Sequence, residues 1–546
     1  MVMQNVQHSS VNLSPVSPLD FLARAGEVYP EKTAIIYGKR SHSYTEFVAR
    51  TEALARAIRA EIQPGDRVAF LAPNIPELLI AHFAVPLAGG VLVAINTRLG
   101  TGEVTEILRH SGAALLFVDA ELARQHGADW RRSTVVATTI EIADPEFGLE
   151  RSGLGVGELD YAAFVARHSG SGGDLEWGVA DELGLISLNY TSGTTGAPKG
   201  VMYTHRGAYL NAIGEMHHNA FDADTVYLWT LPLFHCNGWC GPWAVTAAGG
   251  THVCLREVRA EHIWDAIDSL GISHLSGAPT VCSTIVNAKM AHAVQTPLRI
   301  TTAGAPPTPA VLAQLESLDI EVVHAYGLTE TYGPITVCEH QPGWAQLSPA
   351  ERARMVSRQG VAMVQANRAR VVTEDMADVV ADGETLGEIV FRGNTVMLGY
   401  FNDPEATAAA FAGGWFHTGD LGVMHPDGYI EIKDRAKDII ISGGENISSV
   451  EVENAMSGHP AVHDIAVVGY PHEHWGERPK AYVLVKPGTQ ATETELLEFA
   501  RGVLAKYKVP DYVVFVEQLP RTATGKVTKG ALRALADRPA PVSNAS

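Results

Sequence analysis

The segment from Tyr190 to Gly200 combines the residue types that bind phosphate groups. It reads Tyr-Thr-Ser-Gly-Thr-Thr-Gly-Ala-Pro-Lys-Gly and directly follows Leu185–Asn189, an apolar run typical of a buried strand. Hydroxyl groups can donate hydrogen bonds to phosphate oxygens, glycines let the backbone approach closely, and a lysine adds positive charge. A flexible surface loop needs no such concentration of these residue types. The sequence therefore predicts a phosphate-binding loop that uses Thr191, Ser192, Gly193, Thr194, Thr195 and Lys199.

This loop is not of the P-loop NTPase kind. In that motif the lysine is followed by Ser or Thr, whose hydroxyl group binds Mg²⁺. Here Lys199 is followed by Gly200, and the spacing of the glycines also differs. The P-loop NTPase fold is therefore disfavoured.

Two further segments place a carboxylate beside groups that suit a nucleotide. Tyr326-Gly-Leu-Thr-Glu330 sets a hydroxyl next to a carboxylate, and the Mg²⁺ that accompanies ATP prefers oxygen ligands. Asp420 precedes Arg435 by about fifteen residues, and an aspartate that accepts two hydroxyl protons can hold a ribose. Each segment also has a simpler interpretation: Glu330 as a solvated loop charge, and Asp420 with Arg435 as an ion pair at a domain edge.

A histidine and two cysteines lie close together in the segment Leu233–Cys240. His235, Cys236 and Cys240 loosely resemble half of a metal site, but no second Cys/His pair follows at zinc-finger distance. Buried and unreactive thiols are the favoured interpretation, and His235 taken alone is typical of a core histidine. Lys526, in the segment Pro520-Arg-Thr-Ala-Thr-Gly-Lys526, would by itself be a solubilising surface charge.

The composition is that of a large globular protein. The chain has 546 residues, of which 46% are hydrophobic and 19% charged, so two or more domains are expected. A net charge of −20 argues against nucleic-acid binding, but not against ATP, whose phosphates are held by local groups. The five cysteines are too few for a disulfide-stapled secreted protein and fit reduced thiols in a cytosol.

We expect a cytoplasmic protein without a membrane span. The first twenty residues lack the apolar core of a secretory signal, and Asn544–Ser546 is not a Ser-Lys-Leu peroxisomal address. The most apolar stretch, Ile75–Ile95, is interrupted by two prolines, a glutamate and a histidine. It therefore predicts a core helix that runs into a strand instead of a spanning helix.

The elements that must position these residues alternate along the chain. Val68–Ala72, Ala114–Val118 and Leu185–Asn189 are predicted to be buried strands. Tyr44–Ala60 has the spacing of an amphipathic helix, with its apolar face formed by Phe47, Leu54, Ala55 and Ile58. Such alternation over hundreds of residues predicts an α/β fold with mostly parallel sheets.

The residue pattern of the sequence changes near residue 430. His425-Pro-Asp-Gly428 is a strong turn signal, and about 110 residues of strand and helix patterns follow, enough for one small domain. We place the boundary at Lys437. The expected organisation is a flexible tail over 1–18, a large N-terminal domain over 19–436 and a small C-terminal domain over 437–546.

In these segments the chain resembles the adenylate-forming superfamily of acyl-CoA synthetases, adenylation domains and luciferases. The phosphate loop, Gly304-Ala-Pro306, Tyr326–Glu330, Trp415–Asp420 and Pro520–Lys526 occur in the superfamily's order across the whole chain. The resemblance implies stacked α/β layers with a β-barrel-like subdomain in the large domain, and a mobile α+β small domain. It assigns the nucleotide to Thr191, Ser192, Gly193, Thr194, Thr195, Lys199, His235, Gly304, Ala305, Pro306, Tyr326, Gly327, Thr329, Asp420, Arg435 and Lys526.

The resemblance also implies catalytic roles and a hinge. Lys526 would stabilise the carboxylate that attacks the α-phosphate, Thr191 and Glu330 would hold Mg²⁺, and His235 would gate between the ATP and coenzyme A states. Lys437 would be the hinge about which the small domain rotates. The expected coenzyme A residues are Lys437, Gly443, Gly444 and Trp475, and the expected acyl-pocket residues are His235, Trp239, Gly327 and Gly333.

One branch of the superfamily resembles this chain in two longer runs, Phe234–Cys240 and Lys433–Ser448. That branch includes methylmercaptopropionate-CoA ligases and plant acyl-activating enzymes for short-chain and benzoic acids. It implies an ATP-dependent, AMP-forming acid–thiol ligase that uses Mg²⁺ and coenzyme A. Bulky Trp239, together with Trp243 and Tyr332 if they face inward, would shorten the pocket to a short or medium aliphatic, thioether or aryl acid.

Other functions remain open at this point. A long-chain fatty-acyl-CoA ligase, an adenylation enzyme that loads a carrier protein and a luciferase-like oxygenase would share the first half-reaction. A non-catalytic nucleotide sensor would need no lysine for an attacking group, so the presence of Lys526, Glu330 and Asp420 together argues against it. No nucleic-acid partner is expected, and a homodimer is the assembly considered.

Overall fold

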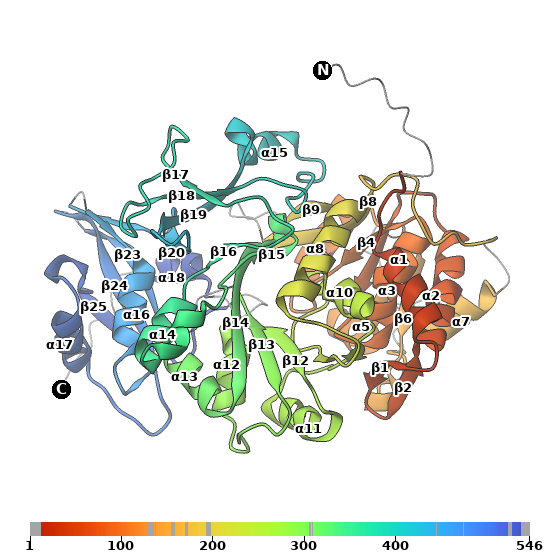
Figure 1. The fold of residues 1–546 in the computed structure, drawn as a ribbon, viewed down its shortest axis with the longest axis horizontal. Helices are drawn as coiled ribbons and strands as arrows, with labels where there is room; N and C mark the ends of the chain where they lie inside the picture. The colour runs from red at the N-terminus through yellow and green to blue at the C-terminus, as the bar shows by residue number, and fades with distance from the viewer. Residues whose placement is uncertain are drawn as a thin grey trace. The chain divides into compact units, whose positions relative to one another are not determined.

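The computed structural model describes residues 13–127, 136, 138–153, 159–169, 173–192, 198–304, 307, 309–443, 445–472, 474–521 and 527–536. The chain forms two compact units, whose elements are labelled in Figure 1. Unit 1 comprises the described residues up to Val356, with Ala362–Arg368 and Arg392–Gly414. Unit 2 comprises Ser357–Val361, Ala369–Phe391 and the described residues from Trp415 onward.

The larger sheet of unit 1 is mostly parallel. Eight of its strands lie wholly in unit 1, in the order β15-β14-β13-β12-β10-β11-β1-β2, and only β15 and β2 pair antiparallel to their neighbours. Their bounds are β1 Thr33–Tyr37, β2 Arg40–Ser43, β10 Val226–Leu228, β11 Thr251–Val253, β12 His274–Gly277, β13 Leu298–Thr302, β14 Ile320–Leu328 and β15 Gly333–Val337.

The second sheet of unit 1 has seven strands in the order β7-β6-β5-β3-β4-β8-β9. All pairs are parallel except β8 with β9, which form an antiparallel hairpin at the edge. The bounds are β3 Arg67–Leu71, β4 Val91–Ala94, β5 Leu115–Asp119, β6 Thr138–Ile142, β7 Leu159–Asp160, β8 Leu185–Ser192 and β9 Pro198–Thr204.

Helices cover these sheets, as parallel strands require. One core cluster packs β3, β4 and β5 against α4 and α5. Figure 1 shows α12 and α13 beside strands β12 to β14. The helices of unit 1 are α1 Leu19–Val28, α2 Tyr44–Arg59, α3 Pro76–Leu87, α4 Thr101–Ser111, α5 Ala120–His126, α7 Tyr161–Arg167, α8 His205–His218, α10 Gly241–Ala248, α11 Ala260–Leu270, α12 Pro279–Val286, α13 Pro309–Ser317, α14 Pro349–Val356 and α15 Pro404–Ala410.

Unit 2 contains two further sheets. The strands β17, β18, β19 and β20 form an antiparallel sheet in chain order, and β22-β21-β24-β23 form another, with β25 parallel to β24. The strands are β17 Arg370–Val372, β18 Gly387–Phe391, β19 Phe416–Met424, β20 Ile430–Arg435, β21 Ile440–Ser442, β22 Glu445–Ile447, β23 Val462–His472, β24 Gly476–Val485 and β25 Tyr512–Phe515. The helices are α16 Ser449–Ser457, α17 Glu493–Val503 and α18 Lys529–Ala536.

The predicted elements agree closely with the structure. The three predicted strands are β3, β5 and β8, the predicted amphipathic helix is α2, and Ile75–Ile95 is helix α3 followed by strand β4. Helix α2 begins where expected because Ser43 and Glu46 form a capping box, in which each backbone N–H donates to the other's side chain. The α/β fold class is confirmed. In place of a barrel, the described strands β17 to β20 form an open sheet.

A buried ion cluster joins the two sheets of unit 1. Arg256, which follows β11, donates to Asp119 at the end of β5 at 2.9 Å and to Asp144 at 3.0 Å. The three side chains are 5%, 0% and 2% exposed. Removing one partner from a buried pair leaves an uncompensated charge, which costs far more than losing a surface pair.

We expect Arg256→Met to lower the free energy of unfolding of unit 1 by about 3–5 kcal/mol, because Asp119 would stay buried without a cation and Asp144 would keep only the longer contact to Arg40, at 3.7 Å. Urea denaturation followed by tryptophan fluorescence measures this. Arg259→Met is the matched control, since Arg259 pairs with Glu257 where both side chains are exposed, and it should change stability by less than about 0.5 kcal/mol. Equal midpoints for the two variants would contradict the account.

Candidate functional site

The β8–β9 hairpin holds the ends of the predicted phosphate loop together. Thr191 on β8 lies directly opposite Lys199 on β9, and Ser192 lies opposite Pro198. Residues 398–401 then run along β9: Phe401 N–H donates to Gly200 O at 2.7 Å, and Leu398 N–H donates to Met202 O at 3.0 Å. Thr191 and Lys199 therefore occupy directly opposite positions on a paired ladder.

Tyr400 connects Lys199 to Glu330. The Lys199 ammonium lies over the Tyr400 ring, 4.8 Å from its centroid, and the Tyr400 hydroxyl donates to Glu330 Oε1 at 2.8 Å. Burial and the adjacent Glu330 carboxylate raise the pKa of Tyr400, so the phenol stays a proton donor. The backbone adds a second link, because Met397 N–H donates to Glu330 O at 2.8 Å. The Tyr400 side chain thus contacts both Lys199, which is predicted to bind the nucleotide, and Glu330, which is predicted to bind its metal ion.

The donor set suits a magnesium ion that arrives with a nucleotide. Among the described residues, no group of three or more His, Cys, Asp or Glu side chains could hold a metal ion by itself. Mg²⁺ is usually bound through one or two carboxylates together with substrate phosphates and water. Glu330 and Thr191 offer a carboxylate and a hydroxyl, which fit that mode of binding.

The end of strand β14 supplies the next predicted residues. Tyr326 and Gly327 lie within this nine-residue strand, and a 3₁₀ turn over Thr329–Thr331 follows. Gly327 cannot carry a side chain, because a Cβ atom there would lie 1.8 Å from Gly333 O. The carbonyl of Thr329 accepts a hydrogen bond from Tyr203 Oη at 2.6 Å. Gly304 follows β13, so these segments emerge at the carboxyl edge of a parallel sheet, where α/β proteins place ligands.

His235 is a neutral ring in this site. It follows β10 in the same sheet, and its surroundings lower the pKa of His235 to about 4 by desolvation. The imidazole is therefore uncharged at neutral pH and can stack or accept a hydrogen bond, but it gives no charge to a phosphate. Cys236 and Cys240 are buried free thiols, and burial raises the pKa of Cys236 to about 12. The prediction that these thiols are buried is confirmed, and their lack of reactivity stays a prediction.

The residues after His235 form a left-handed turn that the sequence did not predict. The φ angles of Cys236, Asn237, Gly238, Trp239 and Cys240 are 51°, 50°, 56°, 56° and 60°. L-residues avoid this region at a cost of roughly 1–2 kcal/mol each, so the surrounding contacts must hold the turn in place. Gly238 allows the turn to lie against Trp229, because a Cβ atom there would be 2.6 Å from the indole.

This turn directs Trp239 onto the predicted acyl-pocket residues. Trp239 is 6% exposed and packs with Leu231, Cys236, Ala303 and Ala325 in one cluster. A Cβ atom on Gly333 would lie 2.9 Å from the Trp239 ring, so the indole rests on that glycine. Trp239, Gly327 and Gly333 are therefore brought together, as the sequence predicted.

Trp243 and Tyr332 are fully buried in the core of unit 1. Trp243 Nε1 donates to His82 O of helix α3 at 3.2 Å. The Tyr332 ring stacks on Tyr203 at 3.9 Å, and its hydroxyl accepts a hydrogen bond from Thr204 N–H at 2.7 Å. Neither belongs to the cluster around Trp239.

The predicted ribose pair lies in unit 2. Asp420 on β19 is in register with Arg435 on β20, and Arg435 Nε lies 3.2 Å from Asp420 Oδ1. The carboxylate is 4% exposed. The ion pair considered from the sequence is therefore present, and contact with a ribose stays a prediction.

The predicted coenzyme A residues that the structure describes also lie in unit 2. Gly443 N–H donates to Trp475 O at 2.8 Å, and a Cβ atom on Gly443 would lie 2.7 Å from the indole. The Trp475 side chain is 47% exposed. Lys437 is exposed, and its carbonyl accepts a hydrogen bond from Arg533 of helix α18 at 3.1 Å.

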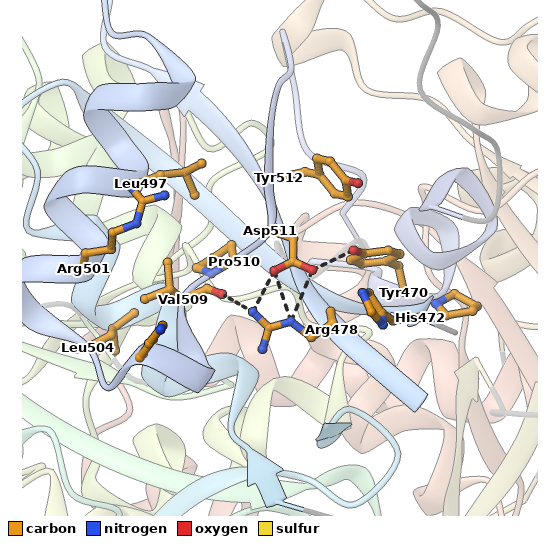
Figure 2. A pocket seen from close by; sticks show the side chains of 12 residues that line it. Tyr470, His472, Arg478, Leu497, Arg501, Leu504, Val509, Pro510, Asp511 and Tyr512 are labelled. Atoms are coloured by element: carbon orange, nitrogen blue, oxygen red, sulfur yellow. Dashed lines mark hydrogen bonds and ion pairs between the residues drawn. The ribbon is translucent and has the colours of Figure 1, made fainter. Parts of the chain in front are cut away.

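A hollow of about 850 Å³ in unit 2 is lined by residues that include Tyr470, His472, Arg478 and Asp511 (Figure 2). His472 lines it and accepts hydrogen bonds from the N–H groups of His474 and Trp475. Figure 2 shows Arg478 paired with Asp511, which also accepts a hydrogen bond from Tyr470. The lining also includes two further cations and a second aromatic ring, from Arg501, Lys506 and Tyr512.

Several predicted residues lie outside the described part of the chain. They are Gly193, Thr194, Thr195, Ala305, Pro306, Gly444 and Lys526.

Sequence reasoning missed several residues that hold the site together, namely Tyr400, Tyr203, Asn189 and Asn237. Tyr400 is about 200 residues from Lys199, and no local pattern marks it. Asn237-Gly238 did carry a signal, because Asn and Gly are the residues that best tolerate positive φ.

Comparison with known proteins identifies the class to which this geometry belongs. The family model "AMP-binding enzyme" matches residues 22–401, and "AMP-binding enzyme C-terminal domain" matches residues 451–526. An acetate–CoA ligase of Humulus lupulus is 44% identical, with 98% of this chain and 97% of the relative covered. A peroxisomal benzoate–CoA ligase of Arabidopsis thaliana is 40% identical, covering 98% and 95%.

A solved structure shares the fold over nearly the whole chain. It is o-succinylbenzoate CoA synthetase from Bacillus subtilis in complex with its acyl-adenylate intermediate, with a TM-score of 0.79 and 27% identity, covering 94% of this chain and 97% of that one. The protein therefore belongs to the AMP-binding enzyme family. The predictions of an adenylate-forming fold and of an AMP-forming acid–thiol ligase are confirmed at the level of the class. Among the described residues, no helix is long and apolar enough to cross a membrane.

Proposed function

We propose that this protein joins a small carboxylic acid to coenzyme A at the expense of ATP, through an acyl-adenylate. Its products are the acyl-CoA thioester, AMP and diphosphate. The observation that supports this most directly is the Lys199–Tyr400–Glu330 arrangement beside the β8–β9 hairpin, because it sets a cation and a metal-binding carboxylate at one loop. The relatives named as CoA ligases, aligned over nearly their whole length, support the thiol acceptor.

In the first half-reaction, the carboxylate of the acid attacks the α-phosphate of ATP, and diphosphate leaves. Thr191 and Lys199 would bind the phosphates, and neutral His235 would pack against the nucleotide without repelling a cation. Mg²⁺ held by Glu330 and Thr191 would supply charge neutralisation for the phosphates. Lys526, which the resemblance assigns to the attacking carboxylate, would stabilise the negative charge that develops on the phosphoryl oxygens.

In the second half-reaction, the thiol of coenzyme A displaces AMP from the acyl carbon. Rotation of the C-terminal domain, with its boundary at Lys437, would replace Lys526 by the face that carries Gly443 and Trp475. Exposed Trp475 offers a stacking surface for an adenine. The hollow in unit 2, with Arg501 and Lys506, offers cations for the phosphates of coenzyme A.

The acid is proposed to be short, or of the size of a benzoate. Trp239 occupies the space between β13, β14 and Gly333, and a large indole leaves room for a short chain only. A thioether acid such as methylmercaptopropionate has a similar length and remains a candidate. A cytoplasmic location is also kept as a proposal, although the benzoate–CoA ligase relative is named as peroxisomal.

Lys526→Ala should reduce acid-dependent ATP–pyrophosphate exchange by about 10²–10³-fold, the size expected when a charge-stabilising group is lost. Formation of the thioester from supplied acyl-adenylate and coenzyme A should change by less than about threefold, because the phosphate charge no longer develops in that step. Lys486→Ala is the control, since Lys486 is exposed at the end of β24, and it should leave both rates unchanged. Equal loss of both half-reactions would remove Lys526 from its proposed role.

Trp239→Gly should shift the preferred acid towards longer chains, because it removes the indole that rests on Gly333. Glycine also adopts the positive φ of this position readily, so the turn should survive the substitution. The measurement is kcat/KM across straight-chain acids from acetate to decanoate. Each methylene accommodated should gain roughly 2- to 4-fold, as its burial is worth about 0.8 kcal/mol at most.

Trp243→Phe provides the matched control for this experiment. It shortens another buried tryptophan, whose indole bonds to His82 and lies outside the Trp239 cluster. The control should lower thermal stability and leave the chain-length profile unchanged. An unchanged profile in Trp239→Gly would show that Trp239 does not limit the acyl pocket.

A further inference from the structure

The left-handed turn at Cys236–Cys240 is fastened to strand β8 by one buried amide. Asn237 Oδ1 accepts a hydrogen bond from Ser187 Oγ at 2.7 Å and another from Asn189 Nδ2 at 2.7 Å. Asn189 Nδ2 also lies 3.2 Å from Ser187 Oγ, so the three side chains form one closed group. They are 0%, 0% and 1% exposed for Asn237, Ser187 and Asn189. Water therefore does not compete for these bonds.

Strand β8 carries this group towards the predicted phosphate loop. Alternate residues of a strand share a face, so Ser187 and Asn189 share theirs with Thr191. Asn189 lies two residues before Thr191, which faces Lys199 across the hairpin. The acyl side and the nucleotide side of the site are thus joined through Asn237 by short, buried hydrogen bonds.

The other polar contacts of the turn are internal or long, and its apolar contacts are the packing of Gly238 on Trp229 and of Trp239 in its cluster. The backbone bond from Gly238 N–H to His235 O is internal to the segment. Cys236 Sγ and Cys240 Sγ make long contacts of 3.4 Å to Thr329 Oγ1 and 3.8 Å to Tyr332 O. The Asn237 side chain makes the shorter polar bonds to an element outside the turn. Trp239 lies two residues further on and rests on Gly333.

We propose that Asn237 is a positioning residue that sets the depth of the acyl pocket, by fixing the turn that carries Trp239 to strand β8. The inference rests on the proposed function, because it concerns the acid that this site adenylates. The alternative explanation for Asn237 is that Asn tolerates the positive φ of this position, and this explanation needs no hydrogen bond to β8. Asn237→Gly separates the two explanations, since glycine keeps the backbone freedom and loses both bonds.

The test compares wild type, Asn237→Gly, Ser187→Ala and the double variant by acid-dependent ATP–pyrophosphate exchange, with butyrate and octanoate as probes. Asn237→Gly should raise KM for butyrate about tenfold, the size expected for two net hydrogen bonds, and KM for ATP by less than about threefold. The preference for butyrate over octanoate should fall by a similar factor. Ser187→Ala should have a smaller effect of the same kind, and no effect in the Asn237→Gly background.

Asn219→Gly is the control for loss of any buried amide. Asn219 is 3% exposed and bonds Glu215, with no hydrogen bond to the turn among the described residues. It should lower the melting temperature without changing the butyrate-to-octanoate ratio. If Asn237→Gly does not yield folded protein, Ser187→Ala carries the test, because it leaves the backbone of the turn unchanged.

The outcomes distinguish the inference from the proposed function. If no acid stimulates ATP–pyrophosphate exchange by the wild-type enzyme, the proposed function is overturned, and this inference with it. Active wild type with equal changes in KM for acid and for ATP, or with independent effects of Ser187→Ala and Asn237→Gly, would overturn only the inference. The inference is supported if Asn237→Gly selectively lowers the preference for butyrate over octanoate and if Ser187→Ala causes no further change in the Asn237→Gly background.

Discussion

The antiparallel β8–β9 hairpin is the constraint on which the site of unit 1 depends. It ends a sheet that is otherwise parallel, and it places Thr191 opposite Lys199 at the two ends of the predicted phosphate loop. Its neighbours attach to the same two strands: Tyr400 pairs with Val201, Tyr203 bonds to Thr329, and Asn189 bonds to Asn237. A shift of the hairpin would therefore move the predicted phosphate loop, the predicted metal ligand Glu330 and the turn that carries Trp239 together.

Neutral side chains surround the few ionisable groups near the β8–β9 hairpin. Burial holds His235 unprotonated and Tyr400 protonated, and Tyr400 contacts both Lys199 and Glu330. Charges in a partly desolvated site interact more strongly than in water, which is why Lys199 and Glu330 are proposed to orient a nucleotide. The protein's overall charge of −20 does not oppose this, because the potential at a phosphate is set by groups within a few ångströms.

Much of the fold and part of the site could be predicted from the sequence, because they depend on local patterns. Apolar runs gave β3, β5 and β8, a capping box fixed the start of α2, and motif chemistry selected Thr191, Lys199 and Glu330. The left-handed turn was missed because helical and turn propensities do not anticipate consecutive positive φ angles at cysteine and tryptophan. Tyr400 was missed because its role arises from pairing between segments about 200 residues apart, which no local window contains.

The central claim is that ATP activates a small acid as an adenylate, which coenzyme A then captures. Release of AMP across a panel of acids from acetate to decanoate, with benzoate and methylmercaptopropionate, measured with and without coenzyme A, tests it most directly. We expect fast AMP release only when a short or aryl acid and coenzyme A are both present, and slow release without the thiol. AMP release that is independent of coenzyme A, or that is greatest with decanoate, would contradict it.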